Sequence, residues 1–358
     1  MKKIVTIVGA RPQFVKAAVV SRALAKFGIG EVIIHTGQHF DENMSAVFFE
    51  EMQIPKPKYN LEISNLGHGA MTGRMLEKIE KILILEKPDL VLVYGDTNST
   101  LAGALAASKL HIRVGHVEAG LRSFNNQMPE EINRILTDRI ASILFCPTTT
   151  AIENLRKEGY ENLDCQIINS GDVMQDAAQF YAEISDQRST IIEKLQLGQQ
   201  PFILATIHRQ ENTDDPLKLK NIFEALNEIN TIERVVLPIH PRTRNIMAQA
   251  DIKSSFEPID PVGYLDMIQL LKNCNMVLTD SGGLQKEAYF FQKHCITLRD
   301  ETEWTELVEQ GYNLLAGNNQ AGILEAYHKL KSKSSDFSQN LYGNGHASET
   351  IAKLLANL

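Results

Sequence analysis

Residues 4–35 read IVTIVGARPQFVKAAVVSRALAKFGIGEVIIH, and their pattern is the strongest indication of the fold. It contains a short β-branched apolar run at 4–8, a longer helical pattern at 14–27 and a second apolar run at 31–35. Continuous apolar runs, rather than alternating ones, are typical of parallel strands that are covered on both faces. The stretch therefore predicts a strand–helix–strand unit of a parallel α/β sheet.

The same alternation continues along the chain and then starts a second time. Further strands are predicted at 90–94, 112–117 and 143–146, and in a second series at 202–206, 235–239, 276–279 and 295–298. Further helices are predicted between them, at 70–86, 98–110, 217–229, 264–273 and 283–291. Two such series predict two doubly wound, Rossmann-like domains.

We place the N-terminal domain at 1–168 and the C-terminal domain at 169–346. A short helical pattern at 347–358 follows, and we expect it to pack back on the N-terminal domain. In open α/β sheets, ligands bind beyond the carboxyl ends of the strands. Polar residues that directly follow a strand are therefore the first candidates for a functional site.

The composition narrows the class of protein. The chain has 358 residues, of which 43% are hydrophobic and 22% charged, so it is globular and too long for one ordinary core. The net charge of -8 and the absence of a basic stripe argue against a nucleic-acid-binding protein. The four cysteines lack metal-ligand spacing, and no apolar run reaches the length of a membrane span. We therefore expect a cytoplasmic protein.

The first strand ends in GARPQFVK, where Gly9 permits a tight turn into a helix. Arg11 and Lys16 then lie near a helix N-terminus, where an anion is favoured. The two side chains could contact a phosphate. They could equally be solvated charges on a helix surface, and the motif by itself leaves both interpretations open.

Three carboxylates follow the strands of the first series. Asp96 stands in YGDTNST, Glu118 in GHVEAGLRS, and Glu130 beside Glu131 in MPEEINR. Asp96 could be a helix cap, and acidic residues favour helix starts, but Glu118 caps nothing obvious. Clustered carboxylates push their pKa values apart, so that one can be a base while another is an acid. A reaction that inverts a carbon needs proton-transfer groups on both of its faces.

The second series carries candidates for binding a diphosphate. His208 and Arg209 follow the strand at 202–206. Ser281, Gly282 and Gly283 follow the strand at 276–279 and can present backbone N–H groups at a helix N-terminus.

Glu287 lies one turn into that helix and could accept hydrogen bonds from ribose hydroxyls. The alternative is a glycine-rich connection with a serine cap, which would need no ligand.

In this order, the motifs resemble the non-hydrolysing UDP-N-acetylglucosamine 2-epimerase family. The motifs that carry the resemblance are GARPQFVK, YGDTNST, GHVEAGLRS, PEEINR, HRQEN, TDSGGLQKEA and RDETE. The resemblance implies a glycosyltransferase-B architecture, with the active site in the cleft between two Rossmann-like domains. It also implies a homodimer that needs no metal or nicotinamide. The implied reaction is anti elimination of UDP to a 2-acetamidoglycal, followed by re-addition of UDP to the other face.

The resemblance also implies roles for individual positions. The catalytic residues would be Asp96, Glu118, Glu130 and His208. The UDP-binding residues would be Arg11, Lys16, Ser281, Gly282, Gly283 and Glu287. Further candidates for the site are Arg122, Arg209, Met267 and Trp304.

Three departures from the family pattern bear on the substrate. The usual GTRPE reads GARPQ here, with Gln13; DTTTT reads DTNST; and RDTTERPE reads RDETEWTE. Trp304 thus replaces an arginine that helps to hold UDP. The combination resembles the branch that converts UDP-2,3-diacetamido-2,3-dideoxy-D-glucuronate to its mannuronate epimer for surface polysaccharides such as the lipopolysaccharide O-antigen.

Four other functions remain open on the sequence. These are a UDP-N-acetylglucosamine 2-epimerase, a hydrolysing epimerase, a glycosyltransferase of the same architecture, and a nucleotide-sugar sensor without catalytic activity. A sensor would not need several carboxylates around the sugar.

Overall fold

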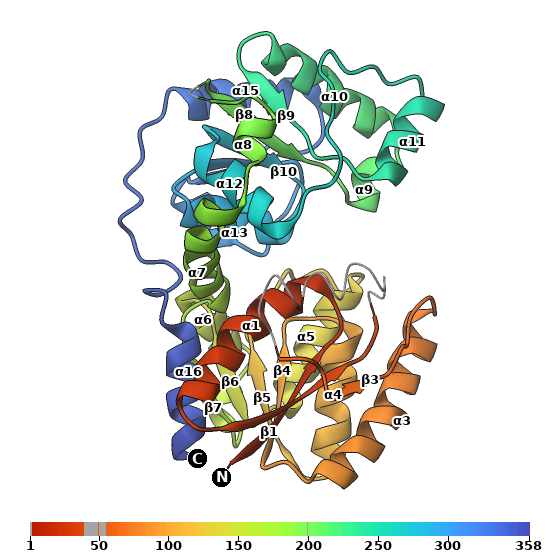
Figure 1. Cartoon of the computed structure of the whole chain (residues 1–358), viewed down its shortest axis with the longest axis vertical. Helices are drawn as coiled ribbons and strands as arrows, with labels where there is room; N and C mark the ends of the chain where they lie inside the picture. Colours follow the sequence, from red (N-terminus) through yellow and green to blue (C-terminus); the bar gives the residue numbers. More distant parts are fainter. Residues whose placement is uncertain (1, 39–48, 50–54, 199) are drawn as a thin grey trace. The chain divides into compact units, whose positions relative to one another are not determined.

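The structure is a computed structural model that describes residues 2–38, 49, 55–198 and 200–358. The chain forms two compact units (Figure 1). Unit 1 consists of Met1–Ala177 and Asn340–Leu358, and unit 2 consists of Ala178–Gln339. Both units have a parallel sheet with flanking helices, so the predicted α/β class is confirmed. The domain boundary between residues 168 and 169 stays a prediction.

The sheet of unit 1 has the strand order β3-β2-β1-β4-β5-β6-β7, and neighbouring strands pair in parallel. The strands are β1 (Lys3–Val8), β2 (Gly30–His35), β3 (Tyr59–Asn60), β4 (Leu90–Tyr94), β5 (Arg113–Val117), β6 (Ile143–Cys146) and β7 (Gln166–Asn169). The chain winds outward from β1 in one direction and resumes at β4 in the other. The carboxyl ends of β1 and β4 therefore form the switch point, where ligands bind in doubly wound sheets.

The helices of unit 1 flank this sheet. They are α1 (Arg11–Lys26), α3 (His68–Glu86), α4 (Asn98–Lys109), α5 (Pro129–Ile140), α6 (Thr149–Lys157), η1 (Tyr160–Asn162) and α16 (Ala347–Asn357). Right-handed crossovers place α1 and α4 on opposite faces, because their connections run in opposite directions along the sheet. The helix α7 (Val173–Arg188) contains the division between the two units.

The C-terminal helix α16 belongs to unit 1, where it lies beside α1 (Figure 1). The Lys2 ammonium donates to the carbonyls of Leu355 and Ala356, at 3.2 and 2.9 Å. At the other end of α16, the backbone N–H of Ser348 donates to Asp176 Oδ2 at 2.7 Å. Polar contacts therefore hold both ends of this helix to unit 1.

The sheet of unit 2 has the order β12-β11-β10-β8-β9, again with parallel pairing. Its strands are β8 (Phe202–Thr206), β9 (Arg234–Val236), β10 (Met276–Thr279), β11 (His294–Thr297) and β12 (Asn313–Leu315). Its helices are α8 (Ile191–Lys194), α9 (Gln210–Thr213), α10 (Pro216–Asn230), α11 (Pro241–Gln249), α12 (Tyr264–Asn273), α13 (Gly282–Phe290), α14 (Thr305–Glu309) and α15 (Gln320–Lys331). The switch point of this unit lies between β8 and β10.

Most predicted strands are confirmed within a residue or two, and they differ from the structure mainly at the edges of the sheets. The strand predicted at 235–239 ends at Val236, and Pro238 beyond it forms only an isolated bridge to Ile259. The strands β3, β7 and β12 carry no continuous apolar run that would have predicted them. Among the residues the structure describes, no helix is long and apolar enough to cross a bilayer.

Candidate active site

A cavity of about 160 Å³ opens at the switch point of unit 1. Three predicted site residues, Lys16, Asp96 and Glu130, lie in its wall. The complete lining is Ala10, Pro12, Gln13, Lys16, Gln38, His68, Gly95, Asp96, Thr97, Asn98, Pro129, Glu130 and Asn133. Arg11 is the first residue of α1, but its side chain lies outside the described part of the structure.

Asp96 faces the cavity and does not cap the helix that follows it. The cap of α4 is Thr97, whose hydroxyl accepts the N–H of Thr100. The Asp96 carboxylate accepts a hydrogen bond from Arg134 Nη1 at 2.5 Å, and 34% of its side chain is exposed. Burial of the carboxyl raises its pKa, with Arg134 opposing the shift. A carboxyl with a raised pKa is suited to both taking up and releasing a proton.

Glu118 and Lys16 form an ion pair beside Asp96. About nine-tenths of both side chains is buried, and Lys16 Nζ donates to Glu118 Oε2. Glu118 has a backbone φ of +73°, a conformation that costs energy for a residue with a Cβ and that concentrates at functional sites. A Cβ at Gly95 would lie 3.2 Å from Glu118 Oε2 and 3.3 Å from Lys16 Nζ. The glycine therefore leaves room for the ion pair to lie under the loop that carries Asp96.

The adjacent residues Glu130 and Glu131 have different surroundings. Glu130 is exposed and lines the cavity. Glu131 is fully buried, where it accepts the N–H groups of Ser123 and Phe124 and two hydrogen bonds from Arg134. Burial would raise the pKa of Glu131, but these donors hold it below its usual value. Glu131 thus fixes a loop, and only Glu130 is available to a ligand.

Gln13 joins the two loops at the switch point. Its side-chain oxygen accepts the N–H groups of Gly9 and Ala10, at 2.8 and 3.0 Å. Its amide nitrogen donates to the Tyr94 carbonyl at 2.7 Å and the Thr100 hydroxyl at 2.9 Å. A glutamate in the same place would direct an oxygen at the Tyr94 carbonyl. An amide therefore suits this position better than a carboxylate.

A chain of side-chain amides leads from Asp96 to His68. Asn133 donates to the main-chain carbonyl of Asp96 at 2.9 Å and to the Asn98 side-chain oxygen at 3.3 Å. The Asn98 amide nitrogen then lies 3.2 Å from His68 Nδ1. The Asp96 main-chain carbonyl can only accept a hydrogen bond, so Asn133 must present its amide nitrogen to it. Asn98 must then present its oxygen to Asn133 and its nitrogen to His68. His68 Nδ1 therefore accepts, and a neutral His68 carries its proton on Nε2.

Sequence reasoning did not assign His68, Asn98, Asn133 or Arg134 to the site. The last two lie three and four residues after Glu130 on α5, so helical spacing from that carboxylate would have indicated them. His68 had no comparable signal, because its place depends on how α3 packs against α4.

Arg122 is not brought into the cavity. Its guanidinium is 3% exposed and forms two hydrogen bonds with Glu158 and one with Asp138. Asp138 also accepts from His116 Nδ1 at 2.6 Å, while His116 Nε2 lies 2.7 Å from the Gly95 carbonyl. This buried network holds the loops that carry Asp96 and Glu118 in place.

In unit 2, His208 and Asp280 meet at the switch point. The ring nitrogen Nδ1 of His208 lies 2.9 Å from Asp280 Oδ1. The His208 side chain is 55% exposed, whereas Asp280 is fully buried. The carboxylate also accepts the backbone N–H groups of His208 and Arg209 and the Asn212 amide.

The predicted residues Ser281, Gly282 and Gly283 lie at the N-terminus of α13. Ser281 caps the helix by accepting the N–H of Leu284. A Cβ at Gly282 would collide with Glu303 Oε1, whereas one at Gly283 would meet nothing within 4 Å. A side chain at Gly282 would therefore have to displace the Glu303 carboxylate, whereas one at Gly283 would have open space beside it.

Trp304 packs against the first turn of this helix. The indole is 3% exposed, donates from Nε1 to the Gly282 carbonyl at 2.9 Å, and has the Lys286 ammonium 4.0 Å from its ring centre. Trp304 thus contacts the first turn of α13 and lies buried against it.

Two further candidates in unit 2, Glu287 and Met267, are buried or partly buried. Glu287 is 7% exposed and accepts a hydrogen bond from the Tyr264 hydroxyl at 3.0 Å. Met267 packs against the hydrophobic core that includes Leu270 and Leu271. Among the residues that the structure describes, no three or more His, Cys, Asp or Glu side chains form a group that could hold a metal ion.

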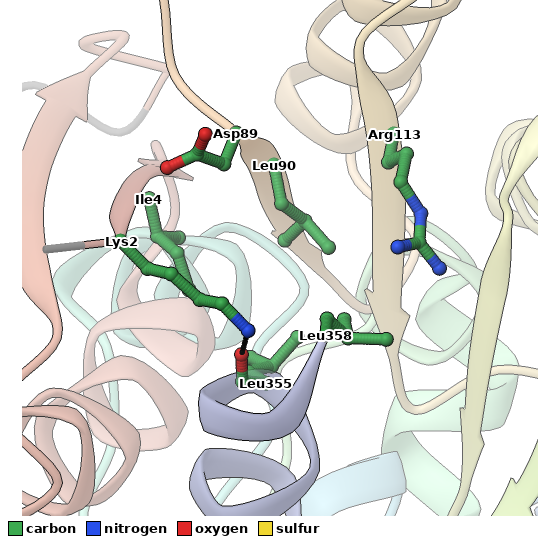
Figure 2. A pocket seen from close by; sticks show the side chains of 7 residues that line it. All are labelled: Lys2, Ile4, Asp89, Leu90, Arg113, Leu355 and Leu358. Carbon is green, nitrogen blue, oxygen red and sulfur yellow. Dashed lines mark hydrogen bonds between the residues drawn. The ribbon is translucent and has the colours of Figure 1, made fainter.

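A second cavity, of about 200 Å³, lies at the amino ends of the unit 1 strands, opposite the first cavity. Figure 2 shows its lining near the amino ends of β1, β4 and β5, with the Lys2 ammonium bonded to the Leu355 carbonyl. It contains none of the predicted site residues, and doubly wound sheets bind ligands at the carboxyl ends of their strands. The active-site candidate is therefore the cavity at the carboxyl ends.

Comparison with known proteins gives one consistent family. The family model described as UDP-N-acetylglucosamine 2-epimerase matches residues 22–356. A Pseudomonas aeruginosa protein named UDP-2,3-diacetamido-2,3-dideoxy-D-glucuronate 2-epimerase is 57% identical, over 99% of this chain and 100% of the relative. A Methanococcus maripaludis protein named as a UDP-N-acetylglucosamine 2-epimerase homolog is 51% identical, over 99% and 100%.

Among solved structures, Methanocaldococcus jannaschii UDP-GlcNAc 2-epimerase in complex with UDP-GlcNAc and UDP is similar over its full length. The two chains superimpose with a TM-score of 0.90 and 44% identity, covering 100% of each. A Streptomyces glycosyltransferase superimposes with a TM-score of 0.56 at 16% identity, which is evidence for the fold alone.

Proposed function

This chain belongs to the UDP-N-acetylglucosamine 2-epimerase family, and we propose that it inverts C2 of a UDP-linked acetamido sugar. The proposed substrate is UDP-2,3-diacetamido-2,3-dideoxy-D-glucuronate, and the product is its mannuronate epimer. The observation that carries the proposal is the gathering of Asp96, Glu118 and Glu130 at one switch point. The choice of sugar is supported by the 57% identical relative that bears this name.

The chemistry explains why several carboxylates are needed. The C2 proton of a resting sugar is not acidic, so the C1–O bond must begin to break first. The leaving UDP takes the electrons of that bond, C2 gives its proton to a carboxylate, and a C1–C2 double bond forms. Return of a proton to the other face of C2, with re-addition of UDP at C1, completes the inversion. Such a sequence needs positioned proton carriers and stabilisation of the leaving diphosphate.

The carboxylates of unit 1 have the different surroundings that this division of work requires. Asp96 is paired with a guanidinium and partly open, Glu118 is paired with a buried ammonium, and Glu130 is exposed. We assign the proton transfers at C2 to these three groups. We assign the UDP moiety to the α13 N-terminus, where Ser281 and Gly282 begin a helix whose dipole favours an anion.

A second candidate substrate is UDP-N-acetylglucosamine itself. It is favoured by the similarity to the Methanocaldococcus jannaschii enzyme, whose structure contains this sugar nucleotide. The two substrates differ at C3 and C6, so the same carboxylates could serve either of them at C2.

Deuterium exchange tests the function and the substrate together. The protein is incubated with each UDP-sugar in deuterated water, and deuterium at C2 is measured by mass spectrometry and proton NMR. We expect exchange and epimerisation with the diacetamido uronate, and at most slow exchange with UDP-N-acetylglucosamine. The reverse preference would replace the proposed substrate by the second candidate.

Other outcomes of the same experiment identify the remaining functions. Stoichiometric release of UDP with a free sugar would indicate a hydrolysing epimerase. Binding of both sugars without any exchange would leave a glycosyltransferase or a sensor and would refute the epimerase proposal.

We also propose that the protein works in the cytoplasm as a homodimer. Support for the dimer comes from an apolar stripe on α5, where Ile132 and Leu136 are each 46% exposed. These residues are one turn apart and so share a face of the helix. Apolar side chains that lie together on an exposed face can form part of a protein interface.

A further inference from the structure

We propose that Asp280 is a positioning residue that holds His208 doubly protonated against the diphosphate of the ligand. The inference rests on the proposed function, because it assigns the charge on His208 to the departure of UDP. It concerns unit 2 alone, in which both residues lie at the switch point of one sheet.

The strands β8 and β10 bring the two residues together. They pair in parallel, with Thr206 opposite Thr279, so the residues that follow both strands emerge side by side. Asp280 follows β10 directly and accepts from the backbone of His208 at 3.1 Å and of Arg209 at 3.1 Å. These bonds set the course of the loop that carries the imidazole.

The surroundings of Asp280 are made of hydrogen-bond donors. Besides the two backbone N–H groups, Asn212 donates to Oδ2 at 3.2 Å and the His208 ring presents Nδ1 at 2.9 Å. Burial alone would raise the pKa of Asp280, but these donors hold it below its usual value. The group is therefore a carboxylate near neutral pH, and Nδ1 of His208 carries a hydrogen that points at it.

Nε2 of His208 is then the nitrogen that remains for a ligand. The side chain is 55% exposed, and Asp280 is followed at once by Ser281, the cap of α13. A diphosphate at that helix N-terminus would place a second anion beside the ring. An imidazole between a carboxylate and a diphosphate retains both protons, because each anion favours the charged form.

The positive ring would act when the C1–O bond breaks. The leaving oxygen takes the electron pair, and Nε2–H donates a hydrogen bond that strengthens as negative charge develops. The proton stays on the ring, and the same contact weakens when UDP adds back to C1. Asp280 contributes by offsetting the positive charge of the ring, as a buried carboxylate does in other Asp–His pairs.

Other charged groups lie near the same loops and belong in any account of the pH dependence. Arg209 follows His208 and approaches Gly282, as does Glu303. Arg299 donates to Glu303 Oε2 at 3.0 Å. The opposite charges of Arg299 and Glu303 offset each other. Asp280, in contrast, is in direct contact with the His208 ring.

The test compares Asp280→Asn with the wild type. The variant keeps the shape of the side chain but presents an amide to Nδ1, so the ring loses the charge partner. We expect kcat to fall by about 10²- to 10⁴-fold at pH 8 while the Kd for UDP changes less than about tenfold. The alkaline limb of the pH profile of kcat, which reports the enzyme–substrate complex, is expected to move to lower pH, so the loss is smaller at pH 6 than at pH 8.

A matched control separates positioning from simple stabilisation of the loop. Asn212→Ala removes another partner of Asp280 without touching the imidazole. We expect a lower Tm and an unmoved alkaline limb. Equal, pH-independent losses in both variants would show that Asp280 only holds the loop, and would overturn the proposal.

A direct measurement on the wild type reads the protonation of His208 without changing Asp280. In the UDP complex at pH 8, nitrogen-15 NMR should show both ring nitrogens of His208 protonated, with the signal assigned from its absence in His208→Gln. A neutral ring would overturn the proposal. Because this readout requires only UDP binding, it stays informative if the C2 exchange experiment fails and the proposed function is abandoned.

Discussion

Glu130 and Glu131 are neighbours in the chain with different chemical surroundings. The first is exposed in the wall of the cavity, and the second is buried and accepts hydrogen bonds from two backbone N–H groups and Arg134. We expect Glu130→Gln to reduce kcat at least 100-fold with an unchanged Tm. Glu131→Gln should instead lower the free energy of unfolding by about 2–4 kcal/mol, because it leaves buried donors unpaired. Thermal unfolding and steady-state kinetics of both variants check this, and an interchange of the two effects would contradict it.

Asp96 and Glu118 give a second prediction at the residue scale. Both carboxylates lie at the switch point of unit 1, and the UDP moiety is assigned to unit 2. We expect Asp96→Asn and Glu118→Gln each to abolish measurable C2 exchange, while the Kd for UDP by calorimetry stays within about fivefold. Rates near the wild type in both variants would show that the proton transfers are assigned to the wrong groups.

At this scale the sequence predicts a residue's place better than its conformation. The position of Glu118 after a buried strand follows from the pattern, but its φ of +73° and its ion pair with Lys16 depend on packing beneath Gly95. Trp304 is a stronger example. Its contact with the Gly282 carbonyl joins the residue before α14 to the first turn of α13, and no local pattern encodes that contact.

At the scale of secondary-structure elements, Glu86 joins α3 to two strands. Its carboxylate, 4% exposed, accepts from Lys3 of β1 at 2.5 Å and contacts Lys58 at 2.6 Å and the Tyr59 hydroxyl beside it. The hydrogen bond from Lys3 is the largest of the effects that lower the pKa of Glu86 to about 2. A lowered pKa means that the folded state binds the proton more weakly than the unfolded state. The stabilisation is therefore complete above pH ~5 and is lost as the pH falls toward 2.

Glu86→Gln tests this element-scale contact. We expect the variant to lose about 1–2 kcal/mol of unfolding free energy at pH 7, a value reduced from the full shift because the lysines are partly exposed. The difference from the wild type should shrink between pH 5 and pH 3, as measured by denaturant unfolding. Glu77→Gln, which removes an exposed pair with Lys81, is the control and should leave the free energy of unfolding unchanged. A difference that grows on acidification would refute the assignment.

The elements that could be predicted are those with their own hydrophobic pattern. The buried strands β1, β4, β8 and β10 are continuous apolar runs, and they carry the loops that form both switch points. The edge strand β3 is two residues long and exists because β2 offers it hydrogen bonds. The pairing of β8 with β10 likewise follows from strand order, which is why Asp280 was not recognised from the sequence as the partner of His208.

At the scale of the whole molecule, the proposed dimer gives a test. The double substitution Ile132→Glu and Leu136→Glu should convert the dimer to a monomer, because charged side chains would replace the exposed apolar residues of α5. Sedimentation velocity measures the change. Leu217→Glu on α10, where the side chain is 67% exposed, is the matched control and should leave the dimer intact. A wild-type monomer, or a dimer that persists in the double variant, would rule out this interface.

The placement of α16 in unit 1 has a consequence for how the protein is made. The whole of unit 2 is synthesised before residues 340–358, although those residues belong to unit 1. Domains usually fold in the order of their synthesis. Here unit 1 cannot be completed until residues 340–358 have followed unit 2, so the apolar face of α1 that receives α16 remains uncovered until translation of this helix. Nascent chains stalled before residue 347 should consequently recruit chaperones through that exposed face.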